Sequence, residues 1–504
     1  MTPRVAVRIA LPAAAAFFLL TGCGAPGAGA DTVEMHIEAD PSVSMAVWFD
    51  AGSADDPPGK EGLAYVTGQL LSDGGTTELS YQEILDELYP MAAGYSVRVD
   101  KEMTTLSGRV HEDNLDAYLD LFIAAFVEPA FDDADFERIR TDAINSIEKT
   151  LRYASDEELG KSALERLVFE GTAYSHPVTG TVAGLRSLTV DDVKGFYRDR
   201  LGANGAGLAI GGGYPDEARR KLESAIAKLP AGGAAPEAKS IAPKAVEGRR
   251  VLLVDKPGAD ASISFGHPIS VRRGDRDYYA LFIANSWLGE HRNSSSHLFQ
   301  VIREQRGMNY GDYSYIEAFP QGGSRQFPPP NVARSHQLFQ VWIRTLPGEW
   351  AHFALRAAVR EVEDLVENGM SEEDFELTRE FLRKYALHFA DTTSMRLGYA
   401  MDDRFYGIDD HLGTFRKMMD EITLEDVNDA LKRHIDPDRL SFAIVTGEAR
   451  ALSAALASDA PSPVAYPTPK ADSILEEDEL IASYPLSIAT ERIESVPIDG
   501  VFEE

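Results

Sequence analysis

The fold is decided by the stretch Gly62-Leu63-Ala64-Tyr65-Val66-Thr67-Gly68-Gln69-Leu70-Leu71-Ser72-Asp73-Gly74-Gly75-Thr76. Its apolar residues recur at the three- and four-residue spacing of a buried helix. A strand-like run, Met45-Ala46-Val47-Trp48-Phe49, precedes it across a turn rich in Asp, Pro and Gly. At helical pitch Tyr65 and Gln69 lie one turn apart on one face, with Gly68 beside them. The stretch therefore predicts a strand, a loop and a helix that presents positions 65, 68 and 69 together.

This unit resembles the active-site segment of the pitrilysin/insulinase-type (inverzincin) metallopeptidases, with Ala51-Gly52-Ser53 after the strand, an acidic loop, Gly-Leu-Ala and a closing Gly-Thr. That family carries His-x-x-Glu-His on the helix, where two histidines bind zinc and the Glu accepts a proton from zinc-bound water. Here Tyr65, Gly68 and Gln69 stand at the three positions, so both histidines and the general base are absent. The resemblance implies a non-catalytic member of the family.

No zinc motif is displaced elsewhere in the chain. Of the eleven histidines no two have the spacing of a helical metal pair, and the nearest, His291 and His297, are six residues apart. The resemblance implies a third ligand, a Glu on a long helix, and Glu148 falls at that place. Because catalytic zinc sites supply about three protein ligands, one carboxylate is insufficient. We expect Glu148 to be a remnant or to pair with another polar group, and no metal to be bound by this chain.

A second candidate site lies in Leu298-Phe299-Gln300-Val301-Ile302-Arg303-Glu304-Gln305-Arg306-Gly307-Met308-Asn309-Tyr310. Its apolar spacing predicts a helix, Gly307 suits the C-terminal cap, and Tyr310 opens an alternating strand. The segment resembles one in the second domain of the same family, where an Arg and a Tyr seven positions apart hold substrate backbone and help to stabilise the tetrahedral intermediate. Arg303 and Tyr310 have this spacing, and both are donors that can be aimed at an oxyanion. The alternative is a surface ion-paired Arg beside an interface Tyr.

The second half of the chain repeats the first. Each match is a short motif that recurs in the same order: Leu188-Thr189-Val190-Asp191-Asp192-Val193 with Ile422-Thr423-Leu424-Glu425-Asp426-Val427, Leu208-Ala209-Ile210 with Phe442-Ala443-Ile444, and Ala134-Asp135-Phe136-Glu137 with Glu373-Asp374-Phe375-Glu376. Such self-similarity predicts an internal duplication. We expect an α+β protein of two homologous α/β-sandwich domains, which is the half-clamshell of pitrilysin/insulinase-like peptidases.

The predicted domains follow from composition and periodicity: 1–22 a lipoprotein signal peptide, 23–32 a tether, 33–230 an N-terminal peptidase-like domain, 231–248 a linker, 249–458 a C-terminal peptidase-like domain, and 459–504 an extended tail. Within the first domain we expect helices at 81–88, 114–127, 133–153, 156–169, 190–201 and 215–229, and strands at 96–110 and 207–210. The tail has few apolar groups, so we expect it to lie as an extended strap on the surface.

Composition and the first residues bear on partners and location. The net charge of −32 makes contact with nucleic acid or anionic lipid headgroups unfavourable. Arg4 and Arg8 precede an apolar run, Leu11 to Leu20, that is typical of a secretory signal. Leu20-Thr21-Gly22-Cys23 resembles a bacterial lipobox, so we expect lipidation at Cys23 and an exported lipoprotein, periplasmic or at the cell surface. The alternative is an ordinary cleaved signal peptide.

Some bacterial members of the family are heterodimers in which one subunit carries the zinc motif and the other the Arg and Tyr. The leading hypothesis is that this chain is the second kind: a non-catalytic subunit that supplies Arg303 and Tyr310 to a zinc-bearing homologous partner acting on peptides. The rival is a structural or peptide-binding scaffold with no part in proteolysis. A third reading, an active peptidase with unconventional ligands, fails on ligand count.

Overall fold

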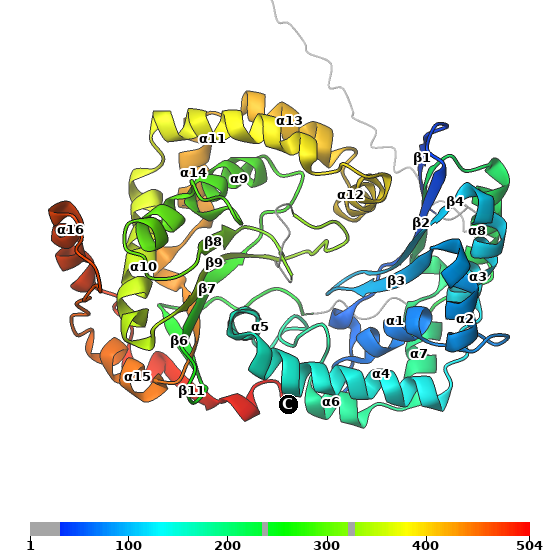
Figure 1. Cartoon of the computed structure of the whole chain (residues 1–504), viewed down its shortest axis with the longest axis horizontal. Coiled ribbons are helices and arrows are strands. Elements are labelled where there is room, and N and C mark those ends of the chain that lie inside the picture. Colours follow the sequence, from blue (N-terminus) through cyan, green and yellow to red (C-terminus); the bar gives the residue numbers. More distant parts are fainter. Residues whose placement is uncertain (1–30, 234–239, 321–327) are drawn as a thin grey trace, which may run out of the picture.

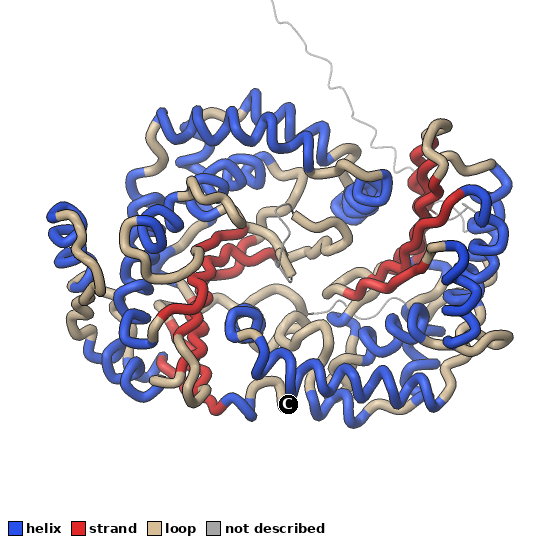
Figure 2. Tube along the Cα trace, viewed as in Figure 1, coloured by secondary structure: helices blue, strands red, loops and turns tan. Residues whose placement is uncertain are grey.

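The computed structural model describes residues 31–233, 240–320 and 328–504. Two α/β domains face each other, each built on one twisted sheet (Figure 1). Figure 2 shows both sheets inside an outer layer of helices. Each domain has its own hydrophobic core between its sheet and its helices.

The first sheet has the order β1-β5-β2-β4-β3, in which only β1 and β5 run parallel. Its strands are β1 (Asp31–His36), β2 (Ser42–Phe49), β3 (Gly94–Val99), β4 (Thr104–His111) and β5 (Ala206–Gly212). Its helices are α1 (Leu63–Asp73), α2 (Tyr81–Leu88), α3 (Leu115–Val127), α4 (Asp133–Asn145), a π-helix (Ser146–Ala154), α5 (Asp156–Val168), α6 (Val182–Ser187), α7 (Val190–Arg200) and α8 (Asp216–Ile226).

The second sheet has the order β11-β6-β10-β7-β9-β8. Its strands are β6 (Arg250–Asp255), β7 (Ala261–Ile269), β8 (Asp312–Tyr315), β9 (Gln337–Leu346), β10 (Ser441–Thr446) and β11 (Ile493–Pro497). Its helices are α9 (Arg276–Gly289), a π-helix (Phe299–Glu304), α10 (Ala351–Asn368), α11 (Glu372–Tyr385), α12 (Thr393–Tyr406), α13 (His411–Glu421), α14 (Leu424–His434), α15 (Ala449–Ser458) and α16 (Asp472–Ala482).

The repeated sequence motif makes the same local structure in both domains. Thr189 accepts a hydrogen bond from the Asp192 N–H (3.2 Å), and the Asp192 carboxylate accepts one from the Thr189 N–H (2.9 Å). Thr423 and Asp426 form the identical capping box, with the same two distances. Helices α7 and α14 both begin there, and each leads to an inner strand, β5 or β10. The predicted pair of homologous α/β domains is confirmed.

The two domains are joined by an exchange of helices. Helix α5 of the first domain packs against β7, β9 and β10 of the second sheet, and α12 of the second domain packs against β1, β2 and β5 of the first. On the first sheet, Leu397 and Met401 of α12 cover Trp48 and Ala209. Gly211 permits this close approach, because a Cβ there would lie 2.7 Å from Thr393 Cγ2. Each sheet therefore buries its inner face on a helix of the other domain.

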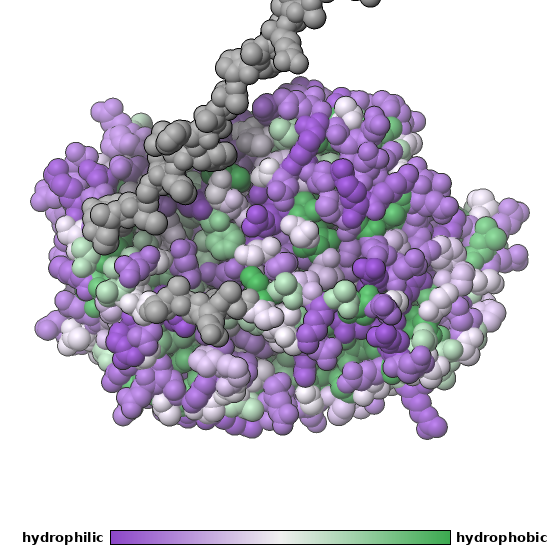
Figure 3. Space-filling model, turned by 180° about the vertical axis from the view of Figure 1, so that it is seen from behind, coloured by the Kyte–Doolittle hydropathy of each residue, from purple (hydrophilic) through white to green (hydrophobic). Residues whose placement is uncertain are grey.

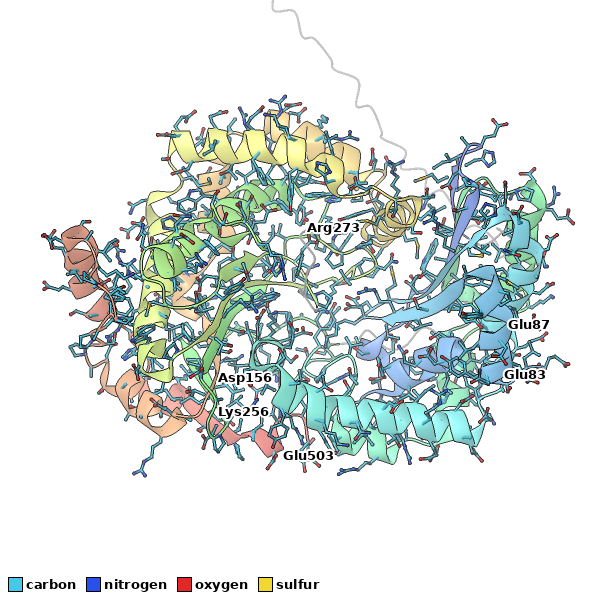
Figure 4. The ribbon with its side chains drawn as sticks, viewed as in Figure 1. Glu83, Glu87, Asp156, Lys256, Arg273 and Glu503 are labelled. Carbon is cyan, nitrogen blue, oxygen red and sulfur yellow. The ribbon has the colours of Figure 1, made fainter. Side chains whose placement is uncertain are left out.

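A cluster of charged groups fastens the same interface. The buried Lys101 ammonium pairs with Glu165 of α5 (2.8 Å), and Arg334 of the second domain pairs with Asp100 (2.7 Å) and Glu165 (3.4 Å). Figure 4 places Asp156, Lys256 and Glu503 together at the lower edge of the molecule, where Lys256 pairs with Asp156. The interface thus combines apolar packing with ion pairs that join distant parts of the chain.

The structure corrects the prediction of one strand over 96–110. Two strands, β3 and β4, form a hairpin around a turn at residues 100–103, closed by the Asp100 N–H donating to the Met103 carbonyl (2.8 Å). The sequence conceals this turn because it contains no Gly or Pro. Two of its charged side chains are held instead by the second domain, since Ser335 donates to Glu102 and Arg334 to Asp100. In addition, β1 begins at Asp31, inside the predicted tether.

The predicted extended tail is also wrong in part. Residues 459–504, hereafter the C-terminal tail, contain helix α16 and strand β11, which pairs in parallel with β6 at the edge of the second sheet. The apolar residues predicted to be too sparse for a core, Ile481, Leu486, Val501 and Phe502, are buried. They are buried because they join cores that other segments build, the last two in the first domain.

The surface agrees with the acidic composition. On the face seen in Figure 3, hydrophobic residues form small groups among hydrophilic ones. None of the helices within the described ranges has the length and apolar content needed to cross a bilayer.

The ionised form of Glu165 should stabilise the domain interface. Burial raises the pKa of Glu165, but the positive charges of Lys101 and Arg334 have the larger effect in the opposite direction. The pKa therefore falls from the ordinary 4.5 to about 2. A carboxylate with a depressed pKa contributes stability that is complete above about pH 4.5 and is lost as the pH falls toward 2. Glu165→Gln should therefore cost roughly 2 kcal/mol of unfolding free energy at pH 7 and flatten the acid limb of the stability curve.

Thermal unfolding of both proteins between pH 2 and pH 7 measures this effect. Glu87→Gln, an exposed position on α2 (labelled in Figure 4), is the matched control and should leave the curve unchanged. Identical curves for the wild type and Glu165→Gln would contradict the assignment.

Candidate functional site

Helix α1 is set in place by a buried carboxyl group. Asp56 accepts hydrogen bonds from the Gly62 and Ala64 N–H groups, both at 2.7 Å, and so caps the first turn. Burial raises the pKa of Asp56 to about 8, although these two N–H groups lower it. These two hydrogen bonds thus fix the orientation of the first turn of the helix.

The position of the missing general base is filled by the neighbouring strand. A Cβ on Gly68 would lie 2.6 Å from Val99 Cγ2 and 3.0 Å from Val97 Cγ1 of β3. Contacts this short are not tolerated, so the strand packs where a side chain at position 68 would start. The side chains of Val97 and Val99 therefore occupy the space that a glutamate side chain at position 68 would need.

The two histidine positions hold groups that suit packing better than metal binding. Tyr65 and Gln69 are half-buried. Burial raises the pKa of the Tyr65 phenol, and the carboxylates of Asp73 and Asp142 raise it further. The phenol is therefore neutral at physiological pH and is a poor zinc ligand. Across residues 31–233, 240–320 and 328–504, no three His, Cys, Asp or Glu side chains converge in a way that could hold a metal ion.

Glu148, at the implied third-ligand position, has a different partner. It lies in the π-helix that follows α4 and pairs with Arg186 of α6 (2.7 Å). Arg186 also pairs with Glu503 of the C-terminal tail (3.3 Å). Glu148 is thus one member of an ion-pair network that connects the first domain with the tail.

Arg303 lies on the π-helix Phe299–Glu304, where the Gln305 N–H donates to the Gln300 carbonyl five residues back (3.0 Å). Such π-helical turns are often found at functional sites. The Arg303 side chain is 38 % exposed, pairs with the adjacent Glu304 and lies over the Phe299 ring. Gly307 follows with φ +70°, as its predicted capping position requires.

Tyr310 comes two residues before β8 and is 73 % exposed. The Arg344 guanidinium of β9 lies 5.5 Å from the centre of its ring, and Arg344 pairs with Glu157 of α5 (2.9 Å). The ring is therefore held at the domain interface with its hydroxyl end free to reach solvent. In the part of the chain that the structure describes, no hydrogen bond joins Arg303 to Tyr310, and each has its own supports.

A cavity of about 420 Å³ lies between the domains. The π-helix at 146–154 and α5 line one side, and β9 lines the other. Its most distinctive contact is Lys161 of α5, whose ammonium lies 3.6 Å from the centre of the Trp342 ring. Arg303 and Tyr310 do not line this cavity. Sequence reasoning missed Lys161, Trp342 and Arg344 because no local motif marks a contact between separate domains.

Restoring the zinc motif should fail on packing. The triple variant Tyr65→His/Gly68→Glu/Gln69→His adds a side chain where β3 already packs, which should cost about 1–3 kcal/mol of stability. We expect it to melt below the wild type and to bind less than one equivalent of zinc, as measured by calorimetry and elemental analysis. Tyr65→His/Gln69→His, which leaves Gly68 intact, is the control and should keep most of the stability. Full zinc occupancy in a stable triple variant would refute the packing argument.

Comparison with known proteins identifies the family that shares this two-domain fold. The family model "Insulinase (Peptidase family M16)" matches residues 32–182, and the model "Peptidase M16 inactive domain" matches residues 187–382. An uncharacterized zinc protease of Streptomyces coelicolor is 26 % identical over 349 residues, which is 66 % of this chain and 69 % of that protein. The non-peptidase homolog YmxG of Helicobacter pylori is 22 % identical over 408 residues, or 79 % and 88 % of the two chains.

A solved structure shares the fold. The peptidase M16 inactive domain from Pseudomonas fluorescens superposes with a TM-score of 0.72 at 21 % identity, covering 83 % of this chain and 95 % of that one. The two family models together span most of both domains. The chain belongs to the insulinase family of peptidases, as a peptidase-like member that has lost the zinc-binding motif.

Proposed function

We propose that this chain is the non-catalytic subunit of a heterodimeric zinc metallopeptidase. It closes a peptide-binding chamber with a homologous subunit that carries the zinc motif. Arg303 and Tyr310 reach into the partner's site, where they hold the substrate backbone and stabilise the oxyanion of the tetrahedral intermediate. The isolated chain is expected to bind no stoichiometric zinc and to cleave no peptide.

The observation that carries this proposal is the exposure of the pair. Tyr310 is 73 % exposed and the Arg303 side chain 38 %, although both belong to a segment whose neighbours Val301 and Ile302 are buried. An exposed Arg is common on a protein surface, but a Tyr kept only for packing would bury most of its ring. Donors meant for another subunit must reach solvent from a fixed backbone, and these two satisfy both requirements.

The local chemistry suits an oxyanion. A guanidinium and a neutral phenol are hydrogen-bond donors that do not react themselves. Within the described ranges, the carboxylate that pairs with Arg303 is that of the exposed Glu304 next to it, and water screens this attraction. A substrate oxyanion can replace this partner at low cost.

The same proposal covers the location of the protein. Cys23 lies outside the described residues, and its lipobox-like context supports lipidation after export. The subunit is then anchored to a membrane by lipid alone, with both domains in the periplasm or at the cell surface. Lipid anchoring confines the chain to a surface, where a membrane-bound partner is met at high effective concentration.

Replacing the two donors tests the catalytic role. In the complex reconstituted with its zinc-bearing partner, Arg303→Ala should lower kcat by about 10²-fold, the typical cost of losing one oxyanion donor. Tyr310→Phe removes only the hydroxyl group and should also lower kcat. The affinity between the subunits, measured by calorimetry, should stay within twofold.

Matched controls for this experiment are Arg450→Ala and Tyr89→Phe, which change exposed residues of the same types elsewhere on the surface. They should leave turnover unchanged. An intact complex with wild-type turnover in both Arg303→Ala and Tyr310→Phe would refute the donor role and favour the scaffold.

The anchor is tested separately. Cys23→Ser should move the protein from the membrane fraction to the soluble fraction of the exporting cell and abolish labelling by a radioactive fatty acid. Continued membrane retention and labelling in this variant would contradict lipidation at Cys23.

A further inference from the structure

The C-terminal tail grips the segment that carries Arg303 and Tyr310. Arg306 lies between them, and its side chain is fully buried (0 % exposed). It donates to Asp478 (2.8 Å) and to Glu477 (2.8 Å) of α16, and to the Val301 carbonyl of the preceding π-helix (2.8 Å). The planar guanidinium thus links the segment to the tail, because one of its hydrogen bonds goes to the backbone of the segment and two go to side chains of α16.

Further contacts strengthen this grip. Lys470 of the tail donates to the Gln305 carbonyl (2.8 Å), which lies just after the end of the π-helix. Tyr466 donates to the second oxygen of Asp478 (2.8 Å), so this carboxylate is oriented from two sides. Arg360 of α10 pairs with Glu477 (3.0 Å), which fixes α16 on the second domain.

The other end of the tail is fastened to the first domain. Arg152 donates to the Val501 carbonyl (3.0 and 2.8 Å) and pairs with Glu503 (3.0 Å). The N–H groups of Val182 and Ala183 at the start of α6 donate to the carbonyls of Phe502 and Glu503. Between the two ends, β11 adds a strand to the second sheet. Figure 4 shows Glu503 at the boundary of the domains, beside the Asp156–Lys256 pair.

We propose that the C-terminal tail is the element that positions Arg303, with Arg306 as the positioning residue through which it acts, while Arg344 of β9 supports Tyr310. A π-helix of six residues has too few internal hydrogen bonds to hold an exposed Arg with the accuracy that an oxyanion donor needs. The tail provides this stiffness from outside the segment. The stiffening of the segment by the tail does not depend on the proposed function, whereas its effect on catalysis rests on that function.

The test is a pair of isosteric tail variants. Glu477→Gln/Asp478→Asn removes both charges from Arg306 and leaves shape unchanged. Glu476→Gln/Glu479→Gln makes the same charge change at exposed positions of the same helix and is the control. In the full-length chain, hydrogen–deuterium exchange of amides 299–310 should become about tenfold or more faster in the first variant only, as expected when buried charge-assisted hydrogen bonds are lost.

The reconstituted complex gives the second measurement. The first variant should lower kcat by about tenfold and leave the subunit affinity unchanged, because the donors are misplaced and not removed. Arg306→Lys keeps the charge but cannot reach three acceptors at once. Its amide exchange rate and its turnover should therefore lie between those of the wild type and those of the double variant. Should the double variant fail to fold, Lys470→Met removes one contact from a partly exposed side chain and should raise exchange by a few-fold.

Unchanged exchange in residues 299–310 of the folded double variant would overturn the positioning role. Faster exchange with wild-type turnover would also overturn it, provided that Arg303→Ala does lower turnover. Wild-type turnover in Arg303→Ala itself would refute the proposed function instead, so the two failures are distinguishable.

Discussion

The structure depends on the inner faces of the two sheets, which neither domain can cover by itself. In the first domain, Ala46, Trp48 and Ala209 line that face, and α12 of the second domain buries them. Helix α5 of the first domain likewise covers the inner face of the second sheet. Because water would otherwise contact two apolar faces, the exchange makes folding of each domain dependent on the other.

This exchange decides where charged groups can lie. It brings the Asp100–Met103 turn against residues 334–335, so that Lys101, Glu165 and Arg334 form a buried cluster. Buried charges are tolerated only when they are paired, and these are. The cluster therefore fixes the angle between the domains, and with it the cavity between α5 and β9.

The two candidate sites differ in their exposure: the one on α1 is packed, and the one on the second domain is open to solvent. On α1, Asp56 caps the first turn and Val97 and Val99 of β3 pack against Gly68, while Glu148 pairs with Arg186, which also pairs with Glu503. The site has become part of the packing. On the second domain, Arg303 and Tyr310 remain exposed and are supported from behind by Arg306 and Arg344. A frame that presents two donors at its surface suits the proposed role of assisting another subunit.

The sequence alone determined what neighbouring residues encode. The helix at α1 and the duplication signalled by Thr189 and Thr423 could be read from local spacing, because helices and caps form from contacts within a few residues. The loss of the zinc ligands, and the choice of Arg303 and Tyr310 as a candidate pair, needed in addition the resemblance of these two segments to a known family.

Only the tertiary structure decided the rest. The turn at residues 100–103, the helix and strand of the C-terminal tail, and the partners of Glu148 and Arg306 arise from residues far away in the chain, such as Arg334, which lies 234 positions from Asp100. No local pattern announces such contacts. They form because a buried charge is stable only when it is paired with an opposite charge, and because apolar surface is stabilised when another segment covers it. The fold brings these distant residues close enough for both.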